Sequence, residues 1–348
     1  MASQSRFGGL DFSTKRMNPR RRGRRGIMAV LQFVVLIAVL LWLAGALWFQ
    51  TGAAIRQGAM IGLACVAVAL LTMWAIGMTR PVWMSVLVIL FASAGWWMTI
   101  RPSNTRIWDA DVEHGVTAAI ATDQVTLANV RNFDWVSRTE FTPRWETRRY
   151  VPGQVVSMDV FTSTWSSPLI AHTLVSFGFS DGQHVAFSAE IRREKGEVFS
   201  NLGGFFRQFE LVLIAADERD MIRLRTDIRG ETVSRFPLDL PQPMLAHAFL
   251  TFATLGNDLA ANPQFYNTVT SNCTTIPFRL ARQIDPTLPF DWRILLSGHF
   301  PAYLQNLGVT GKGQTLDRML ALARLQKTGP TDADGPAFSA RIRAAMAE

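Results

Sequence analysis

Three long apolar segments dominate the first hundred residues. Ile27 to Phe49, Ala59 to Met78 and Val82 to Ile100 are 23, 20 and 19 residues without a charged side chain. A helix of about 20 apolar residues crosses the hydrocarbon core of a bilayer, roughly 30 Å thick. Three such segments in succession predict three transmembrane helices. They do not fit the buried helices of a soluble core or a cleaved signal peptide, which has one shorter apolar run.

Beyond Arg101 the pattern changes to short strands followed by helices. The clearest feature is a hairpin, in which 172–179 and 184–192 alternate around a turn at Asp181-Gly182. From Pro243 the period becomes helical, with one helix over 244–260 and another from Cys273 to about Gln283. Further strands are predicted over 116–130, 155–159, 209–215 and 222–226. This succession predicts an α+β domain of antiparallel strands with packed helices.

Charge divides the chain in the same way. The formal net charge is +8, but residues 1–26 alone carry +7 and the loop residues Arg56 and Arg80 add two. Residues 101–348 therefore carry −1, which gives no support to a nucleic-acid-binding surface. Positive segments stay on the cytoplasmic side of a membrane. We expect a cytoplasmic basic arm at 1–26, a membrane region at 27–100 with a cytoplasmic connection at 79–81, an extracytoplasmic domain at 101–327 and a linker-like tail at 328–348.

The candidate chemistry centres on a cysteine. Cys65 lies within the second apolar segment, so Cys273 is the one thiol of the predicted extracytoplasmic domain. It stands at the start of a predicted helix, where the helix dipole and free N–H groups favour a thiolate. The same N–H groups can bind the oxyanion that forms when a carbonyl is attacked. The alternative is a small buried hydrophobic residue, which is the usual role of a free cysteine.

His172 is the best predicted partner of Cys273, because it begins a strand, where a side chain can reach a cleft. His299 is a weaker candidate, while the remaining histidines, His114, His184 and His247, read as solvated or structural. The tightest hairpin turn places Ile191 opposite His172. A turn one residue longer makes Glu190 or Ser188 able to orient the imidazole.

Other polar features of the sequence do not indicate a functional site. We expect Glu218 and Asp220 to lie in a solvated turn. The sequence has no metal-ligand spacing, no phosphate-binding loop and no dinucleotide fingerprint, so we expect no cofactor.

Taken in order, several short motifs resemble the Lnb-type periplasmic domain of bacterial lipoprotein N-acyltransferases. The matching positions are Pro102–Trp108 with Asp111, Asn129–Phe133, Asp159, Ala171-His172, Phe177, Ser188–Arg192, Gly204, Phe206, Arg207, Glu210, Tyr266-Asn267 and Asn272–Thr275. The resemblance covers roughly residues 100–280. It implies a permuted papain-like (NlpC/P60-like) fold in which the histidine precedes the cysteine, with Cys273 as nucleophile and His172 as general base.

The resemblance also implies a location and a reaction. The chain would lie in the bacterial inner membrane with its large domain in the periplasm. Its reaction would move an acyl chain from a phospholipid or lipoprotein ester to a lipoprotein N-terminal amine through a thioester. Glu190 would orient His172, while Asn272, Thr274 and Tyr266 would position the thiol or bind the oxyanion. Two alternatives remain open: a cysteine amidase or peptidase acting on cell-wall peptide, and a non-catalytic membrane scaffold.

Overall fold

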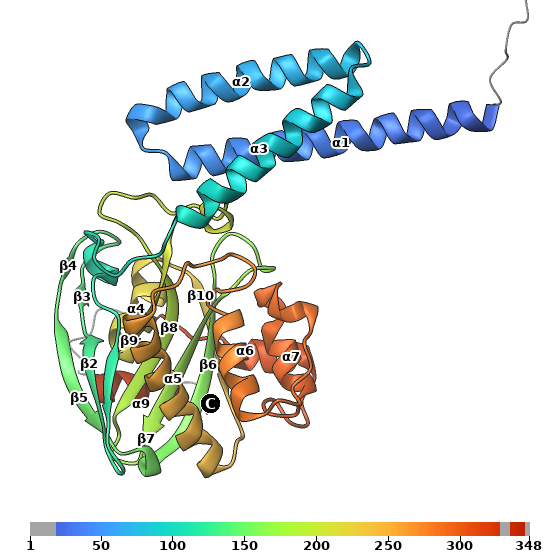
Figure 1. Cartoon of the computed structure of the whole chain (residues 1–348). Helices are drawn as coiled ribbons and strands as arrows, with labels where there is room; N and C mark the ends of the chain where they lie inside the picture. Colours follow the sequence, from blue (N-terminus) through green and yellow to red (C-terminus); the bar gives the residue numbers. More distant parts are fainter. Residues whose placement is uncertain (1–18, 328–334, 345–348) are drawn as a thin grey trace, which may run out of the picture. The chain divides into compact units, whose positions relative to one another are not determined.

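The computed structural model describes residues 19–327 and 335–344, with side chains from residue 27 onward. The first part of the predicted basic arm, residues 1–18, lies outside the described residues. The chain divides into two compact units, Met1–Thr99 and Ile100–Glu348, which are described separately below (Figure 1).

The first unit consists of three apolar helices, α1 (Pro19–Gln50), α2 (Ala53–Ala75) and α3 (Thr79–Thr99). Each is long and apolar enough to cross a membrane, over Ile27–Gln50, Ala53–Ala75 and Thr79–Thr99. The predicted connection at 79–81 is wrong by a few residues. The turn is made by 76–78, where Gly77 adopts a φ of +86°, and Pro81 lies in the first turn of α3, where a proline is tolerated.

The second unit is built on an eight-stranded sheet. Seven of the strands follow the order β1-β2-β9-β8-β7-β6-β10, and the eighth, β5, pairs with β2. Its pairs are antiparallel except β2 with β9, and β3 and β4 form a separate small ladder. The strands are β1 (Thr117–Ile120), β2 (Val125–Arg131), β3 (Asp134–Trp135), β4 (Phe141–Thr142), β5 (Trp145–Tyr150), β6 (Val155–Thr164), β7 (His172–Phe179), β8 (His184–Arg192), β9 (Glu210–Ala216) and β10 (Thr232–Pro237).

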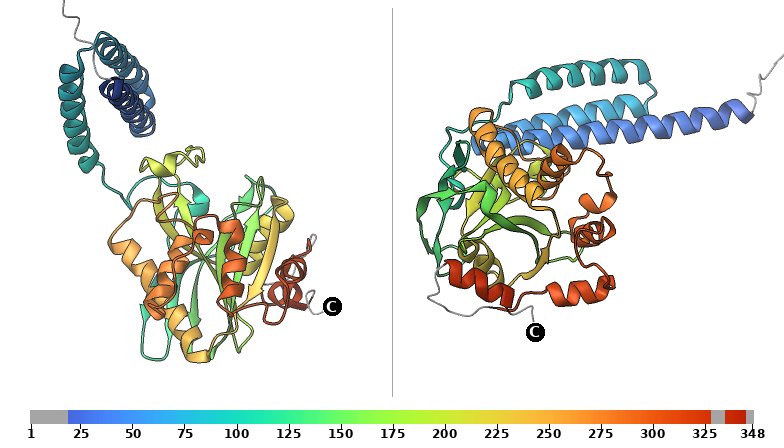
Figure 2. Two further views of the ribbon diagram at one scale, coloured as in Figure 1. Left: turned by 90° about the vertical axis from the view of Figure 1, so that its right-hand side faces the viewer. Right: turned by 90° about the horizontal axis from the view of Figure 1, so that it is seen from below.

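Helices cover both faces of this sheet (Figures 1 and 2). Along β7, Val175 and Phe177 pack with α5 and α6, whereas Leu174 packs with α4 and α9, because successive side chains of a strand point to opposite faces. The helices of this unit are α4 (Glu218–Arg223), α5 (Gln242–Ala261), α6 (Thr275–Ile284), α7 (Phe300–Asn306), α8 (Leu316–Ala323) and α9 (Gly335–Ala344). The predicted α+β class is confirmed.

Two predicted segments differ from the structure. The strand predicted over 222–226 is helical, because the Asp217 side chain accepts a hydrogen bond from the Arg219 N–H and so caps α4, which continues into a π-helical turn at Leu224–Ile228. The predicted linker-like tail contains α9. Phe338 and Ile342, four residues apart on one helical face, are buried against the sheet.

The hairpin register determines what faces His172. β7 ends at Phe179 and β8 begins at His184, so four residues connect the strands. The pairs run from Gly178 with His184 to Val175 with Phe187. Continuing this register by three residues brings His172 opposite Glu190, which corresponds to the longer of the two turns considered from the sequence.

Candidate active site

Cys273 is held directly before α6 by the side chain of Asn272. The Oδ1 atom of Asn272 accepts hydrogen bonds from the N–H groups of Thr274 and Thr275, both at 2.9 Å, and its Nδ2 donates to the carbonyl of Thr268 at 2.8 Å. Asn272 therefore supplies the cap that the first turn of a helix requires. The amide uses both of its ends, which fixes the backbone on either side of the thiol.

The same contacts correct one predicted role. The Thr274 N–H is already bonded to Asn272, and the Thr274 hydroxyl pairs with the Thr173 hydroxyl at 2.8 Å in a buried position. The Thr274 N–H is thus not free to bind an oxyanion, but the Thr274 hydroxyl, which joins α6 to β7, also lies 3.9 Å from the Cys273 Sγ atom. Among the described residues, nothing accepts a hydrogen bond from the Cys273 N–H, and a hydrogen bond from the Thr173 backbone helps to lower the pKa of the Cys273 thiol.

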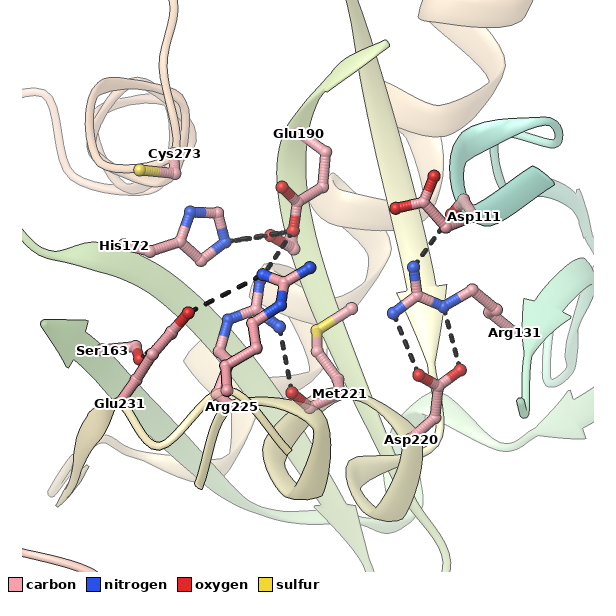
Figure 3. Close-up of polar contacts among 12 residues, drawn as sticks. Asp111, Arg131, Ser163, His172, Glu190, Asp220, Met221, Arg225, Glu231 and Cys273 are labelled. Carbon is pink, nitrogen blue, oxygen red and sulfur yellow. Dashed lines mark hydrogen bonds and ion pairs between the residues drawn. The ribbon is translucent and has the colours of Figure 1, made fainter. Parts of the chain in front are cut away.

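His172 begins β7 and lies between Cys273 and Glu190 (Figure 3). Its Nε2 atom lies 2.7 Å from the Ser188 hydroxyl and 3.1 Å from Glu190 Oε1, while Nδ1 faces Cys273. The Ser188 hydroxyl donates its proton to Glu190 at 2.7 Å, so it accepts the proton on Nε2. With Nε2 protonated, Nδ1 is the nitrogen able to exchange a proton with the thiol.

The residue before His172 is fixed by a serine from a distant segment. The Ala171 N–H donates to the Ser297 hydroxyl at 2.8 Å, and that hydroxyl donates to the Ala171 carbonyl at 2.7 Å. The Cys273 Sγ atom lies 3.9 Å from the same carbonyl oxygen. Ser297 was not identified from the sequence, because a single serine 126 positions away carries no local signal.

Glu190 has a second cationic partner that was also missed. Arg225 Nη2 lies 2.9 Å from Glu190 Oε1, and its Nη1 donates to the Met221 carbonyl at 2.9 Å (Figure 3). Arg225 lies in the π-helical turn that the sequence predicted as a strand. Its contact with Met221, four residues earlier, exists only because this segment is helical.

Electrostatics favour an ion pair between sulfur and imidazole. Burial raises the pKa of Cys273, but the charge of His172 and a hydrogen bond with it outweigh burial and lower the pKa below its ordinary value. Burial lowers the pKa of His172, yet Glu190 and the Cys273 thiolate raise it to about 9. Burial likewise opposes ionisation of Glu190, but His172 and Arg225 hold its pKa well below the usual range. A thiolate, an imidazolium and a carboxylate are thus mutually stabilised.

Tyr266 stays a neutral phenol near this charged group. Its pKa is raised by burial, by the Cys273 thiolate and by Glu190. The Tyr266 N–H donates to the Phe209 carbonyl at 2.9 Å, which ties the loop before Cys273 to the start of β9. Tyr266 therefore lies within electrostatic range of the thiol.

Residues 141–298 match the model of a protein family described as the Lnb N-terminal periplasmic domain. This part of the chain belongs to that family. The matched range contains Cys273, His172 and Glu190, and together with the three apolar helices it makes the chain a membrane protein with a periplasmic domain. No curated protein and no solved structure matches the chain significantly.

The family match begins later than the predicted resemblance, yet the earlier motifs are joined to the Lnb domain by ion pairs with buried carboxylates. Arg131 binds the carboxylate of Asp220 through two nitrogens, at 2.9 and 3.0 Å, and Arg106 lies 3.0 Å from Glu210. These early motif residues thus hold the segment before residue 141 onto the domain.

The prediction that Glu218 and Asp220 form a solvated turn is wrong. Both side chains are fully buried. Asp220 also accepts hydrogen bonds from the Phe133 N–H and the Trp135 indole, and Glu218 binds Arg343 at 2.8 Å. Each carboxylate is paired with an arginine, which is the condition under which an acid is found in a protein core.

A cavity of about 330 Å³ lies beside the imidazole in the Lnb domain. His172 and Glu190 line it together with two large side chains, Trp165 and Phe199. Four arginines complete much of its wall: Arg131, Arg193, Arg225 and Arg229. The other histidines lie outside this lining, and no group of three or more metal-ligating side chains is found in the part of the chain that the structure describes.

Proposed function

We propose that this protein is a membrane-anchored thiol acyltransferase that moves an acyl chain from a lipid ester to the N-terminal amine of a lipoprotein. The observation that carries the proposal is the placement of His172 between Cys273 and the Glu190 carboxylate, in an environment that favours the thiolate. A thiolate with a proton donor beside it is the arrangement used for nucleophilic acyl transfer. Membership of the Lnb domain family supports the choice of lipoproteins as acceptors.

The reaction has two proton-balanced halves. In the first, the Cys273 thiolate attacks the ester carbonyl, the C–O bond breaks, and the alcohol leaves with the proton held by His172, so that an acyl thioester remains. In the second, the lipoprotein amine attacks the thioester and gives a proton to His172, the C–S bond breaks, and the amide departs. The thiolate and imidazolium are then restored. We assign stabilisation of the oxyanion in both halves to the Cys273 N–H.

The membrane helices give the reaction its setting. Both the acyl ester and the lipoprotein are held in a bilayer, so an enzyme anchored in the same membrane meets them at a high effective concentration. The basic residues before the first candidate span, which begins at Ile27, favour a cytoplasmic N-terminus. We therefore place the chain in the bacterial inner membrane, with three crossings that bring residue 101 onward into the periplasm.

The test is production of N-acylated lipoprotein in bacteria that lack their own lipoprotein N-acyltransferase. Mass spectrometry of lipoprotein N-termini should show an added acyl chain with the parent chain and with Cys65→Ser, but not with Cys273→Ala or His172→Ala. Intact-mass measurement should also reveal an acyl adduct that is lost in Cys273→Ala. An abundant, folded parent protein that leaves lipoprotein N-termini free would overturn the assignment. Release of cell-wall peptide fragments by the same protein would instead favour an amidase.

A further inference from the structure

Three loops surround the candidate site at one end of the sheet (Figures 1 and 2). The loop 165–171 leads directly into His172, the loop 193–209 follows β8, and the loop 262–274 leads to Cys273. The last two are joined, because the Thr268 hydroxyl donates to the Asn201 carbonyl at 2.9 Å. They also meet closely at Gly204, where a Cβ atom would lie 2.3 Å from Thr268 Oγ1.

These loops carry an unusual number of exposed apolar side chains. Val198 is 81% exposed and Leu202 is 64% exposed. Every member of the following set is at least 40% exposed: Trp165, Leu169, Ile170, Val198, Phe199, Leu202, Phe205 and Val269. Single exposed apolar residues are ordinary on a protein surface, but a set gathered around a functional site marks a surface that contacts a partner. We call this set the apolar rim.

The rim is continuous with the candidate site. Trp165 and Phe199, each about half exposed, line the same cavity as His172 and Glu190. Whatever covers the rim therefore also lies at the mouth of that cavity.

The connectivity of the chain indicates what covers the apolar rim. Arg207 Nη1 donates to the carbonyl of Ile100 at 3.3 Å. Ile100 is bonded to Thr99, the last residue of the third candidate membrane span. Whatever the arrangement of the two units, the loop that carries Val198, Leu202 and Phe205 is thus held by a hydrogen bond to the residue at which the chain leaves the bilayer.

We propose that the apolar rim docks on the periplasmic face of the bilayer, among the head groups and the upper parts of the acyl chains. Exposed tryptophan, phenylalanine and leucine are the side chains that bury favourably at this depth. The cavity lined by His172 then opens toward lipid, so that an ester can reach the site without leaving the membrane. The docking is independent of catalysis; the supply of the ester from the bilayer rests on the proposed function.

The experiment uses the full chain in lipid nanodiscs of phosphatidylcholine and phosphatidylglycerol. In a Cys65→Ser, Cys273→Ser background, Leu202→Cys carries an environment-sensitive fluorophore, and some of the lipid carries a nitroxide quencher high on one acyl chain. Val156→Cys is the matched control, because Val156 is 59% exposed and lies at the opposite end of β6, roughly 26 Å from Thr164 at a rise of about 3.3 Å per residue. Quenching at positions 202 and 156 can be measured without catalytic turnover. The test therefore remains valid even if the proposed acyl transfer does not occur.

We expect several-fold stronger quenching at position 202 than at position 156. Equal quenching at the two positions would overturn the proposal. A probe at position 202 that reports an apolar environment but is not quenched would also overturn it, because the rim would then be covered by protein, either a second copy or a partner. Adding Val198→Ser, Phe199→Ser and Phe205→Ser should weaken the quenching at position 202. Unchanged quenching would mean that the tether at Ile100, and not the rim, holds the loop at the membrane, and would also overturn the proposal.

Discussion

Glu190 Oε1 lies 3.1 Å from Nε2 of His172 and 2.9 Å from Nη2 of Arg225, so one carboxylate oxygen serves two cations. Arg225 is itself almost wholly buried and paired with Glu190 and the Met221 carbonyl. This arrangement keeps the carboxylate ionised and in place, and the carboxylate in turn stabilises the charged form of the imidazole. The protonation state of His172 therefore depends on Glu190, which lies on the side of the imidazole away from the thiol.

Glu190→Gln should lower kcat by about 10²-fold, the size of effect expected when general acid–base catalysis is impaired. Its pH profile should change as well. The pKa of His172 is raised to about 9 chiefly by Glu190, against the lowering effect of burial. The imidazolium should therefore be lost near pH 9 in the parent chain and at lower pH in the variant, which moves the alkaline limb of kcat downward. Initial rates of thioester formation across pH 5–10 would measure this.

Ser188→Ala is the matched comparison, because it removes a hydrogen bond to the same carboxylate but leaves its charge. We expect a smaller loss of rate and an alkaline limb close to that of the parent. If Glu190→Gln keeps the parental pH profile, Glu190 has only a structural role.

Cys273 should react with iodoacetamide at a lower pH than an ordinary thiol. Its pKa is depressed because the attraction of His172 outweighs burial, so the thiolate persists below the usual range of about 8–9. His172→Ala removes the main compensation for burial and should shift the inflection of the rate upward, with at least about a 10-fold slower reaction at pH 6. Labelling is followed by mass spectrometry in a Cys65→Ser background. Equal rates in the parent and in His172→Ala would show that the imidazole does not activate the thiol.

Features that depend on local pattern could be predicted from the sequence. The three apolar helices follow from the length of uninterrupted apolar segments, and the β7–β8 hairpin follows from alternation around Asp181-Gly182. The helix after Cys273 follows from a change of period and from Pro277 in its first turn. These signals lie within a few residues of the element that they specify.

Features that depend on partners far away in the sequence could not be predicted from it. Glu218 and Asp220 look solvated in sequence because their arginines lie far away, Arg343 at 125 residues and Arg131 at 89. The choice between Glu190 and Ile191 opposite His172 depended on a single residue in the turn, because a one-residue slip exchanges the two faces of a strand. A sequence pattern does not contain either kind of information.

Asn272→Ala should affect both stability and reactivity. The loss of a helix cap costs about 1 kcal/mol, and the backbone around Cys273 loses both anchors provided by the Asn272 amide. We expect the free energy of unfolding to fall by about this amount and the alkylation rate of Cys273 to fall as well. Thr315→Ala provides the control, because Thr315 caps α8 through the Arg318 N–H. It should cost similar stability and leave alkylation unchanged; a parental alkylation rate in Asn272→Ala would contradict the positioning role.

Arg343 of α9 binds two buried carboxylates, Glu218 at 2.8 Å and Asp159 at 2.7 Å. Arg343→Ala leaves both without this cation and should destabilise the periplasmic domain by about 3–5 kcal/mol, the usual cost of breaking a buried ion pair from one side. Lys312→Ala is the control, because Lys312 and Asp239 are both well exposed, and its cost should stay within about 1 kcal/mol. Denaturant unfolding of the full chain in detergent at pH 7 would give both values.

The same pair predicts an acid dependence with a definite sign. Burial opposes ionisation of Glu218, but Arg343 outweighs it and lowers the pKa to about 2. A carboxyl whose pKa is lower in the folded than in the unfolded chain adds stability above its unfolded value of about 4.3 and loses that contribution as the pH falls. The stability difference between parent and Arg343→Ala should therefore be full at pH 6 and shrink between about pH 4.3 and 2. A difference that stays constant over this range would show that α9 stabilises the sheet through Phe338 and Ile342 instead of through charge.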